Sequence, residues 1–122
     1  MTVTAVPSQQ ILNPQLEIAG NRRLSGELRV SGAKNSALVL MAASLLTEDQ
    51  LRLRNVPPLT DIQGMGDILS SLGVKVRRNG ESLEMNGSGL SQSAPPYELV
   101  NSLRASFFCI GPLLAQIGRA HV

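Results

Sequence analysis

Residues 60–85 read TDIQGMGDILSSLGVKVRRNGESLEM, and they are the most informative part of the sequence because a helical pattern changes within them to a strand pattern. Apolar side chains recur at the spacing of one helix face, at Ile62, Met65, Leu69 and Leu72. Thr60 and Gln63 have the spacing of a capping box, and Gly73 follows as a left-handed C-terminal cap. The first part of the stretch therefore predicts an amphipathic helix.

The second part of the stretch predicts a β-hairpin. Residues 74–77 read VKVR and residues 83–85 read LEM, so apolar and charged side chains alternate on both arms. Asn79-Gly80 between the arms is the dipeptide most typical of a tight hairpin turn. We interpret Arg77-Arg78 as solvated residues beside this turn rather than as a binding patch.

Two short strands are predicted upstream, at residues 16–18 and 24–30. Residues 16–30 read LEIAGNRRLSGELRV, in which Gly20-Asn21 separates two alternating runs. Residues 1–15 contain no charged side chain and show little periodicity. We expect them to form a loosely ordered extension.

Helices and strands continue to alternate on either side of the central stretch. Residues 37–46 read ALVLMAASLL, which predicts a helix that is apolar on nearly every side and therefore buried. Residues 51–54 read LRLR, a strand that ends before Pro57-Pro58. A polar linker at 88–96 precedes a last predicted helix at 98–110.

This element order predicts an α/β (α+β) fold built on a compact βαβαββ module. The expected domain organisation is the extension at 1–15, strands and one module at 16–97, and the helix of a following, truncated module at 98–116. One such module leaves sheet edges and apolar helix faces uncovered, so we expect sister modules.

The composition excludes several classes of protein. With 122 residues, 43% of them hydrophobic and 16% charged, the chain can build a core and is not wholly disordered. A net charge of +2 and an aromatic content of 2% argue against nucleic acid as a partner. The single cysteine, Cys109, and the absence of a Cys/His cluster predict neither a disulfide nor a metal site. Without an apolar run long enough to span a membrane, a soluble cytoplasmic protein is expected.

Lys34 is the first candidate for a functional residue. It lies in SGAKNS at 31–36, at a predicted strand-to-helix junction where the helix dipole favours an anion and disfavours a cation. We therefore expect a negative group beside Lys34. That group is either an Asp or Glu of this chain or the phosphate or carboxylate of a ligand, and a ligand-binding lysine and a solvated structural one remain equal alternatives.

Arg104 is the second candidate, because it shares an apolar helix face with Val100 and Phe108 in the predicted 98–110 helix. Its guanidinium either reaches water along a packed stem or binds a phosphate or carboxylate. Cys109 stands between apolar residues and is interpreted as a small buried hydrophobe rather than a nucleophile.

Asp61 and Asp67 are the acidic residues of the predicted central helix. Asp61 suits the first turn of that helix electrostatically. Neither carboxylate has a partner in the sequence pattern that would indicate general acid or base catalysis.

Three motifs in register resemble those of the enolpyruvyl transferase family. They are SGAKNSAL at 31–38, NVPPLTDI at 55–62, and LRAS with GPLLA within 103–115. Within this family the chain resembles the UDP-N-acetylglucosamine 1-carboxyvinyltransferases, from about residue 16 to residue 115. The 5-enolpyruvylshikimate-3-phosphate synthases are the distant alternative, because they typically have Asp-Lys-Ser where this chain has Ala33-Lys34-Asn35.

The resemblance implies a fold, a reaction and a set of binding residues. The fold is the inside-out α/β barrel of two domains, each built from βαβαββ modules. The reaction transfers the enolpyruvyl group of phosphoenolpyruvate to the 3′-hydroxyl of UDP-N-acetylglucosamine, the first committed step of peptidoglycan synthesis and hence of cell-wall growth, cell shape and division. Lys34 and Asn35 match residues that bind phosphoenolpyruvate, and Arg104 matches one that contacts the UDP-sugar. The resemblance implies no cofactor and no metal. The composition and the short apolar runs predict neither nucleic acid nor a membrane as a partner.

The chain departs from the family at its end. The family's proton donor, usually a cysteine in a Pro-Gly-Gly-Cys loop, and its catalytic base follow the GPLLA motif, so we expect no catalytic residue here and no activity from the chain alone. Residues 117–122 read IGRAHV, the translation in one frame of a common sequencing adapter, and are expected to be a non-native tail in which His121 has no function. The alternative is a non-catalytic anion-binding module or a partner-dependent piece.

Overall fold

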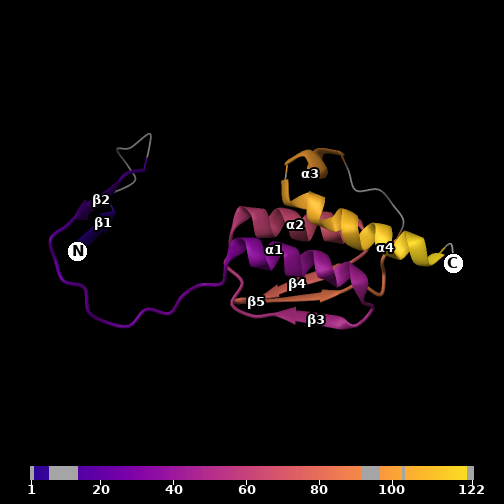
Figure 1. Ribbon diagram of the computed structural model, residues 1–122, viewed down its shortest axis with the longest axis horizontal. Coiled ribbons are helices and arrows are strands. Elements are labelled where there is room, and N and C mark those ends of the chain that lie inside the picture. Colours follow the sequence, from indigo (N-terminus) through magenta and orange to yellow (C-terminus); the bar gives the residue numbers. More distant parts are fainter. Residues whose placement is uncertain (1, 6–13, 92–96, 103, 121–122) are drawn as a thin grey trace. The chain divides into compact units, whose positions relative to one another are not determined.

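The computed structural model describes residues 2–5, 14–91, 97–102 and 104–120. These residues divide into two compact units, residues 1–30 and 31–122. The helices and strands of the two units are shown in Figure 1. Residues mostly contact other residues of their own unit. The predicted site residues Lys34, Asn35 and Arg104 all belong to the second unit.

The first unit is a pair of antiparallel strands. β1 (Thr2–Ala5) pairs with β2 (Leu16–Ala19), with Val3 opposite Ile18. β2 confirms the first predicted strand, whereas β1 corrects the expectation of a loose extension at 1–15. Its β-branched sequence, Thr2-Val3-Thr4, favours a strand once a partner is present. Residues 6–13 of the predicted extension lie outside the described residues.

The strand predicted at 24–30 does not form in the described structure. Gly26 has a φ of 140°, which breaks the extended conformation in the middle of the run. The apolar side chains of the run are exposed, Leu28 by 88%. Alternation alone does not hold a strand, because its backbone groups need a neighbouring strand.

The second unit places helices on one face of a three-stranded antiparallel sheet. β3 (Gln50–Leu53), β4 (Lys75–Asn79) and β5 (Ser82–Asn86) are ordered β3-β5-β4. The hairpin between β4 and β5 confirms the prediction, with Gly80 at a φ of 58° in a two-residue loop. The observed order in this unit is αβαββ, so the predicted βαβαββ module lacks its first strand here.

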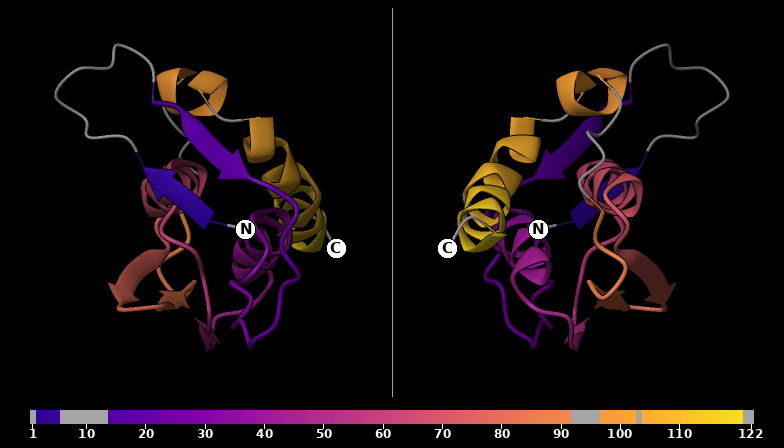
Figure 2. Two further views of the ribbon diagram at one scale, coloured as in Figure 1. Left: turned by 90° about the vertical axis from the view of Figure 1, so that its left-hand side faces the viewer. Right: turned by 90° about the vertical axis from the view of Figure 1, so that its right-hand side faces the viewer.

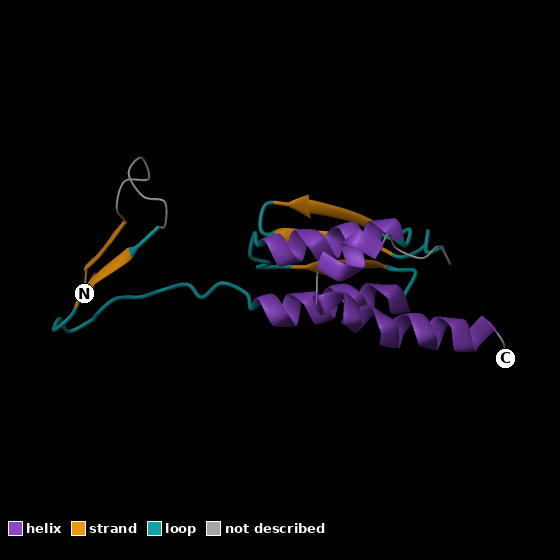
Figure 3. Cartoon of the chain, turned by 90° about the horizontal axis from the view of Figure 1, so that it is seen from above, coloured by secondary structure: helices purple, strands orange, loops and turns teal. Residues whose placement is uncertain are grey.

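Helices α1 (Lys34–Ala43) and α2 (Thr60–Ser71) lie side by side and begin at the same end of the sheet (Figures 1 and 3). A short 3-10 turn at Ser44–Leu46 continues α1. α1 buries one side only, because Val39 and Leu40 are about half exposed, which corrects the prediction of a fully buried helix. Among the described residues, α2 and the Arg104–Cys109 turn contact α1 and leave Val39 and Leu40 partly uncovered.

The start of α2 also differs from its prediction. The helix begins at Thr60 after Leu59, and no side chain caps its N-terminus. Gln63 uses its side-chain amide to donate to the Asp67 carboxylate at 3.1 Å, so the capping box predicted for Thr60 and Gln63 does not form.

The helix predicted at 98–110 is divided into three parts: α3 (Tyr97–Ser102), a 3-10 turn (Arg104–Cys109) and α4 (Ile110–Ala120). The Ser106 hydroxyl donates to the Val100 carbonyl at 3.1 Å, which competes with continuous helical bonding. Pro112 falls in the first turn of α4, where its missing N–H costs no helical bond. Gly111-Pro112 therefore lies at a helix start instead of at a kink.

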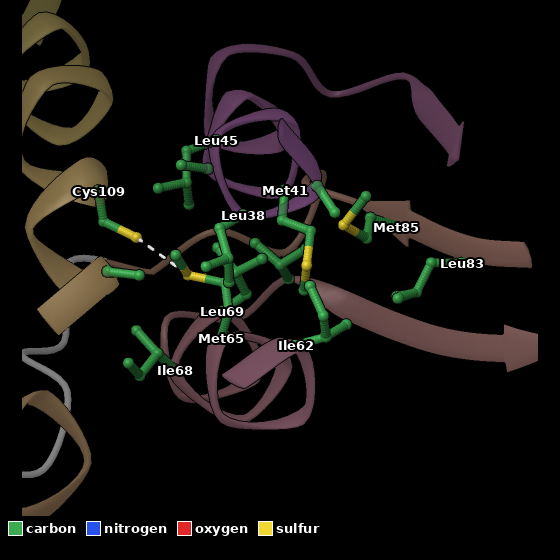
Figure 4. Close-up of a cluster of buried hydrophobic side chains, with 14 of the residues drawn as sticks. Leu38, Met41, Leu45, Ile62, Met65, Ile68, Leu69, Leu83, Met85 and Cys109 are labelled. Atoms are coloured by element: carbon green, nitrogen blue, oxygen red, sulfur yellow. Dashed lines mark hydrogen bonds between the residues drawn. The ribbon is translucent and has the colours of Figure 1, made fainter. Parts of the chain in front are cut away.

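The core lies between the sheet and the two long helices, with the Arg104–Cys109 turn packed on the far side of α1 and α2 (Figures 2 and 4). Aliphatic and methionine side chains fill it, including Leu38, Met41, Met65, Leu69 and Met85. This arrangement confirms the aliphatic core expected from the composition. It also holds the starts of α1 and α2 beside the segment that carries Arg104.

Candidate functional site

The three predicted site residues, Lys34, Asn35 and Arg104, lie on one hollow of about 460 Å³ in the second unit. Lys34 and Asn35 are the first two residues of α1. Arg104 is the first residue of the 3-10 turn that precedes α4. The hollow is lined by Lys34, Asn35, Leu38, Asp61, Arg104, Ala105 and Phe108. The fold therefore brings together residues that are far apart in the sequence.

The start of α1 is left uncapped at this hollow. Ala33 precedes the helix and has no side chain that could accept from its first amides, and the first turn contains no acidic residue. The first backbone N–H groups of a helix have no partner within it, and they carry the positive end of the helix dipole. The start of α1 is therefore suited to an anion.

A close backbone contact fixes the start of α1 against the loop that leads to α2. A Cβ atom at Gly32 would lie 1.9 Å from the carbonyl oxygen of Asn55, so only glycine fits there. Asn55 itself has a φ of 57°, a left-handed conformation that asparagine tolerates better than most residues. Gly32 and Asn55 thus fix the position of the start of α1 relative to the start of α2.

The negative group expected beside Lys34 is Asp61. The Lys34 Nζ atom lies 2.6 Å from Asp61 Oδ2, and both side chains are partly exposed, by 43% and 41%. Asp61 stands in the first turn of α2, where a carboxylate also favours the helix dipole. The sequence pattern placed Asp61 correctly at a helix start but gave no sign of its contact with Lys34.

Arg104 is exposed at the hollow, and no salt bridge to it is found among the described residues. With Lys34 and Asp61 it gives the lining a formal excess of one positive charge, two cations against one carboxylate. The predicted helix face shared by Arg104 and Phe108 persists in part, since both line the hollow. The arrangement can bind an anion through a fork of guanidinium donors, an ammonium group and helix amides.

Cys109 takes no part in this site. Its side chain is buried against Met65, with the two sulfur atoms 3.8 Å apart, as Figure 4 shows. Burial raises the pKa of the Cys109 thiol, which keeps it protonated and unreactive. The interpretation of Cys109 as a small buried hydrophobe is confirmed.

Residues 18–122 match the family model described as EPSP synthase (3-phosphoshikimate 1-carboxyvinyltransferase). The chain belongs to this family. The family membership agrees with the enolpyruvyl transferase resemblance of the motifs at 31–38 and 55–62.

Curated relatives are similar to this chain over nearly all of its length. It is 63% identical over 122 residues to a UDP-N-acetylglucosamine 1-carboxyvinyltransferase of Parasynechococcus marenigrum, covering 100% of this chain and 28% of that protein. It is 64% identical over 115 residues to the protein of the same name from Prochlorococcus marinus strain MIT 9313, covering 94% and 26%. The chain thus spans about a quarter of the length of these relatives.

A solved enolpyruvyl transferase structure is similar in fold to this chain. The enolpyruvyl transferase NikO from Streptomyces tendae matches with a TM-score of 0.68 and 26% identity, over 80% of this chain and 23% of that one. The fold is therefore a part of the enolpyruvyl transferase fold. Among the described residues, no helix is long and apolar enough to cross a membrane.

Proposed function

We propose that this chain supplies the anion-binding part of a UDP-N-acetylglucosamine 1-carboxyvinyltransferase. Such an enzyme transfers the enolpyruvyl group of phosphoenolpyruvate to the 3′-hydroxyl of UDP-N-acetylglucosamine and releases phosphate. The observation that carries the proposal is the hollow on which Lys34, Asn35 and Arg104 meet, in a chain of a carboxyvinyltransferase family. Relatives of that name at 63% and 64% identity support the choice of acceptor.

Each of the three residues has a binding role in this proposal. The Lys34 ammonium and the Asn35 amide, beside the free amides of α1, bind the phosphate and carboxylate of phosphoenolpyruvate. Arg104 contacts the UDP-sugar, whose phosphates suit a guanidinium fork. These residues bind and orient the substrates and transfer no proton, and the reaction needs no organic cofactor or metal.

The proposed place of the reaction is the first committed step of peptidoglycan synthesis in the cytoplasm. Its partners are the two small-molecule substrates, and its product is used for cell-wall growth, cell shape and division. The description of the family names 3-phosphoshikimate, so that compound is the competing acceptor that an assay has to exclude.

A hybrid enzyme tests the proposal. In the Parasynechococcus relative, residues 1–116 of this chain replace the region that matches them, and phosphate release is measured with UDP-N-acetylglucosamine or 3-phosphoshikimate as acceptor. We expect turnover with the first acceptor only. Lys34→Ala should lower kcat/KM about ten- to a hundredfold, through the KM for phosphoenolpyruvate, because it removes a charge-assisted contact. Arg104→Ala should act through the KM for the UDP-sugar.

Lys75→Ala is the matched control, because Lys75 is an exposed lysine of β4 outside the hollow. It should leave the kinetics of the hybrid unchanged. A hybrid that uses 3-phosphoshikimate would overturn the proposed acceptor. A hybrid in which Lys34→Ala is no worse than Lys75→Ala would overturn the proposed binding role.

A further inference from the structure

Asp61 has the wrong charge for the site in which it lies. The described residues that line the hollow include a single carboxylate, that of Asp61, beside the cations Lys34 and Arg104. A carboxylate next to bound phosphate repels it, so simple electrostatics predicts that Asp61 weakens anion binding. Its contact with Lys34 points to a different role.

The ion pair leaves donors of Lys34 available. An ammonium group carries three N–H donors, and the contact at 2.6 Å between Nζ and Asp61 Oδ2 occupies one of them. The other two can donate to a ligand while the pair persists. Asp61 and an anion can therefore share the ammonium instead of competing for it.

The ion pair also limits the freedom of a flexible side chain. Lysine has a long stem with many rotamers, and a half-exposed ammonium without a partner samples them freely. Ordering that stem then opposes binding of a ligand. An ammonium already held by Asp61 has lost part of this freedom before the ligand arrives.

The backbone determines where Asp61 holds the ammonium. Lys34 is the first residue of α1 and Asp61 is the second residue of α2. The tight contact of Gly32 with the Asn55 carbonyl fixes one helix start against the other. The ion pair therefore joins two helix starts whose relative position is fixed by the backbone. It differs in this respect from an ion pair between two exposed side chains of one helix.

We propose that Asp61 is a positioning residue, which holds the Lys34 ammonium at the hollow so that it binds an anion more tightly than it would alone. This inference deepens the proposed function and rests on it for the nature of the anion. It assigns to Asp61 no contact with the reacting atoms.

Binding of phosphoenolpyruvate to the 122-residue chain tests the inference, measured by calorimetric or NMR titration. We expect Asp61→Asn to weaken binding about threefold or more, although the substitution makes the hollow more positive. In a Lys34→Ala background the same substitution should no longer weaken binding, because only the repulsion by Asp61 remains. Asp61→Glu, which keeps the charge, should restore most of the affinity.

Asp67→Asn is the matched control. It removes the same charge from the same helix, but Asp67 is exposed, accepts a hydrogen bond from Gln63 and lies outside the hollow. It should leave the affinity unchanged. Affinity of Asp61→Asn equal to or tighter than that of the unsubstituted chain overturns the inference and leaves the proposed function standing.

A second measurement separates the inference from the proposed function. The NMR order parameter of the Lys34 side chain should fall in Asp61→Asn and stay constant in Asp67→Asn, with no ligand present. If the unsubstituted chain does not bind phosphoenolpyruvate, the proposed role of the hollow fails, and this order parameter still tests the pair. An unchanged order parameter overturns the inference. Should Asp61→Asn not fold, added salt on the unsubstituted chain should lower the same order parameter.

Discussion

Lys34 illustrates how one residue can be recognised as unusual from the sequence while its partner stays hidden. A cation at a helix start is unfavourable by about 0.3–1 kcal/mol, which is enough to predict a negative neighbour. The sequence left two alternatives for this negative neighbour of Lys34, a carboxylate of the chain and a bound ligand. Asp61 is the partner of Lys34 because the starts of α1 and α2 lie close together in the fold. No local sequence pattern predicts that two helix starts are neighbours.

Glu84 was not singled out by the sequence, although it is buried and ionised. It stands at the centre of β5, opposite Arg52 on β3 and Arg77 on β4. The Arg77 hydrogen bond, and then that of Arg52, hold the pKa of the Glu84 carboxyl below its usual range, against the effect of burial. Glu84 alternates with the core residues Leu83 and Met85. The guanidinium groups of Arg52 and Arg77 cover its carboxylate.

The lowered pKa of Glu84 predicts a dependence of stability on pH. A carboxyl whose pKa is lower in the folded state stabilises the fold above its unfolded pKa, and this contribution is lost as the pH falls through the folded pKa. Glu84→Gln should therefore lower the free energy of unfolding at neutral pH. The difference from the unsubstituted chain should shrink below about pH 4.

Urea denaturation at several pH values measures this effect. Glu48→Gln is the control, because Glu48 is an exposed carboxylate near β3. It should leave the pH profile unchanged. A Glu84→Gln variant that parallels the unsubstituted chain at every pH would contradict the assigned role of the carboxylate.

At the scale of the elements, the connection from α2 to β4 is determined by local chemistry. Gly73 has a φ of 99°, its amide donates to the Ser70 carbonyl, and the Val74 amide donates to the Leu69 carbonyl. These two bonds form a Schellman motif, which ends the helix and satisfies its last carbonyls. The predicted C-terminal cap at Gly73 is confirmed.

Two glycines of this region should respond in opposite directions to alanine. Gly73→Ala should lower the free energy of unfolding by more than about 1 kcal/mol, because φ is positive and a Cβ would lie 2.1 Å from the Gly89 carbonyl oxygen. Gly66→Ala in the middle of α2 should raise it by about 0.5–1 kcal/mol, since its Cβ meets only Val76 Cγ1, at 3.6 Å.

Thermal or urea denaturation of the two variants tests the expected difference in sign. Far-UV circular dichroism shows whether each variant keeps its helices. A stabilising Gly73→Ala, or a Gly66→Ala that loses more stability than Gly73→Ala, would contradict this account of α2.

The sequence predicted best those elements whose signals are local. The α2 helix and the β4–β5 hairpin carry their period, cap and turn within a short stretch, and both form. The run at 24–30 has the right alternation but no neighbouring strand, and the helix predicted at 98–110 is divided in the segment where the Ser106 hydroxyl donates to the Val100 carbonyl. These two predictions depended on contacts with partners, which the pattern does not contain.

At the scale of the second unit, two surfaces could attract an anion. One is the hollow with Lys34, Asn35 and Arg104. The other is the outer face of the sheet, where Lys75 and Arg77 lie around Glu84. The first surface has an uncapped helix start and an exposed Arg104, whereas the Arg77 guanidinium on the second is already paired with a carboxylate. The hollow is therefore the expected anion site.

An NMR titration of the 122-residue chain with phosphoenolpyruvate shows which of the two surfaces binds the anion. We expect saturable shifts of the backbone amides of Lys34, Asn35, Asp61 and Ala105, with a midpoint that moves to higher ligand concentration in Lys34→Ala but not in Lys75→Ala. Shifts confined to Lys75, Arg77 and their neighbours on the sheet, or no saturable shift at all, would contradict the assignment of the anion site to the hollow.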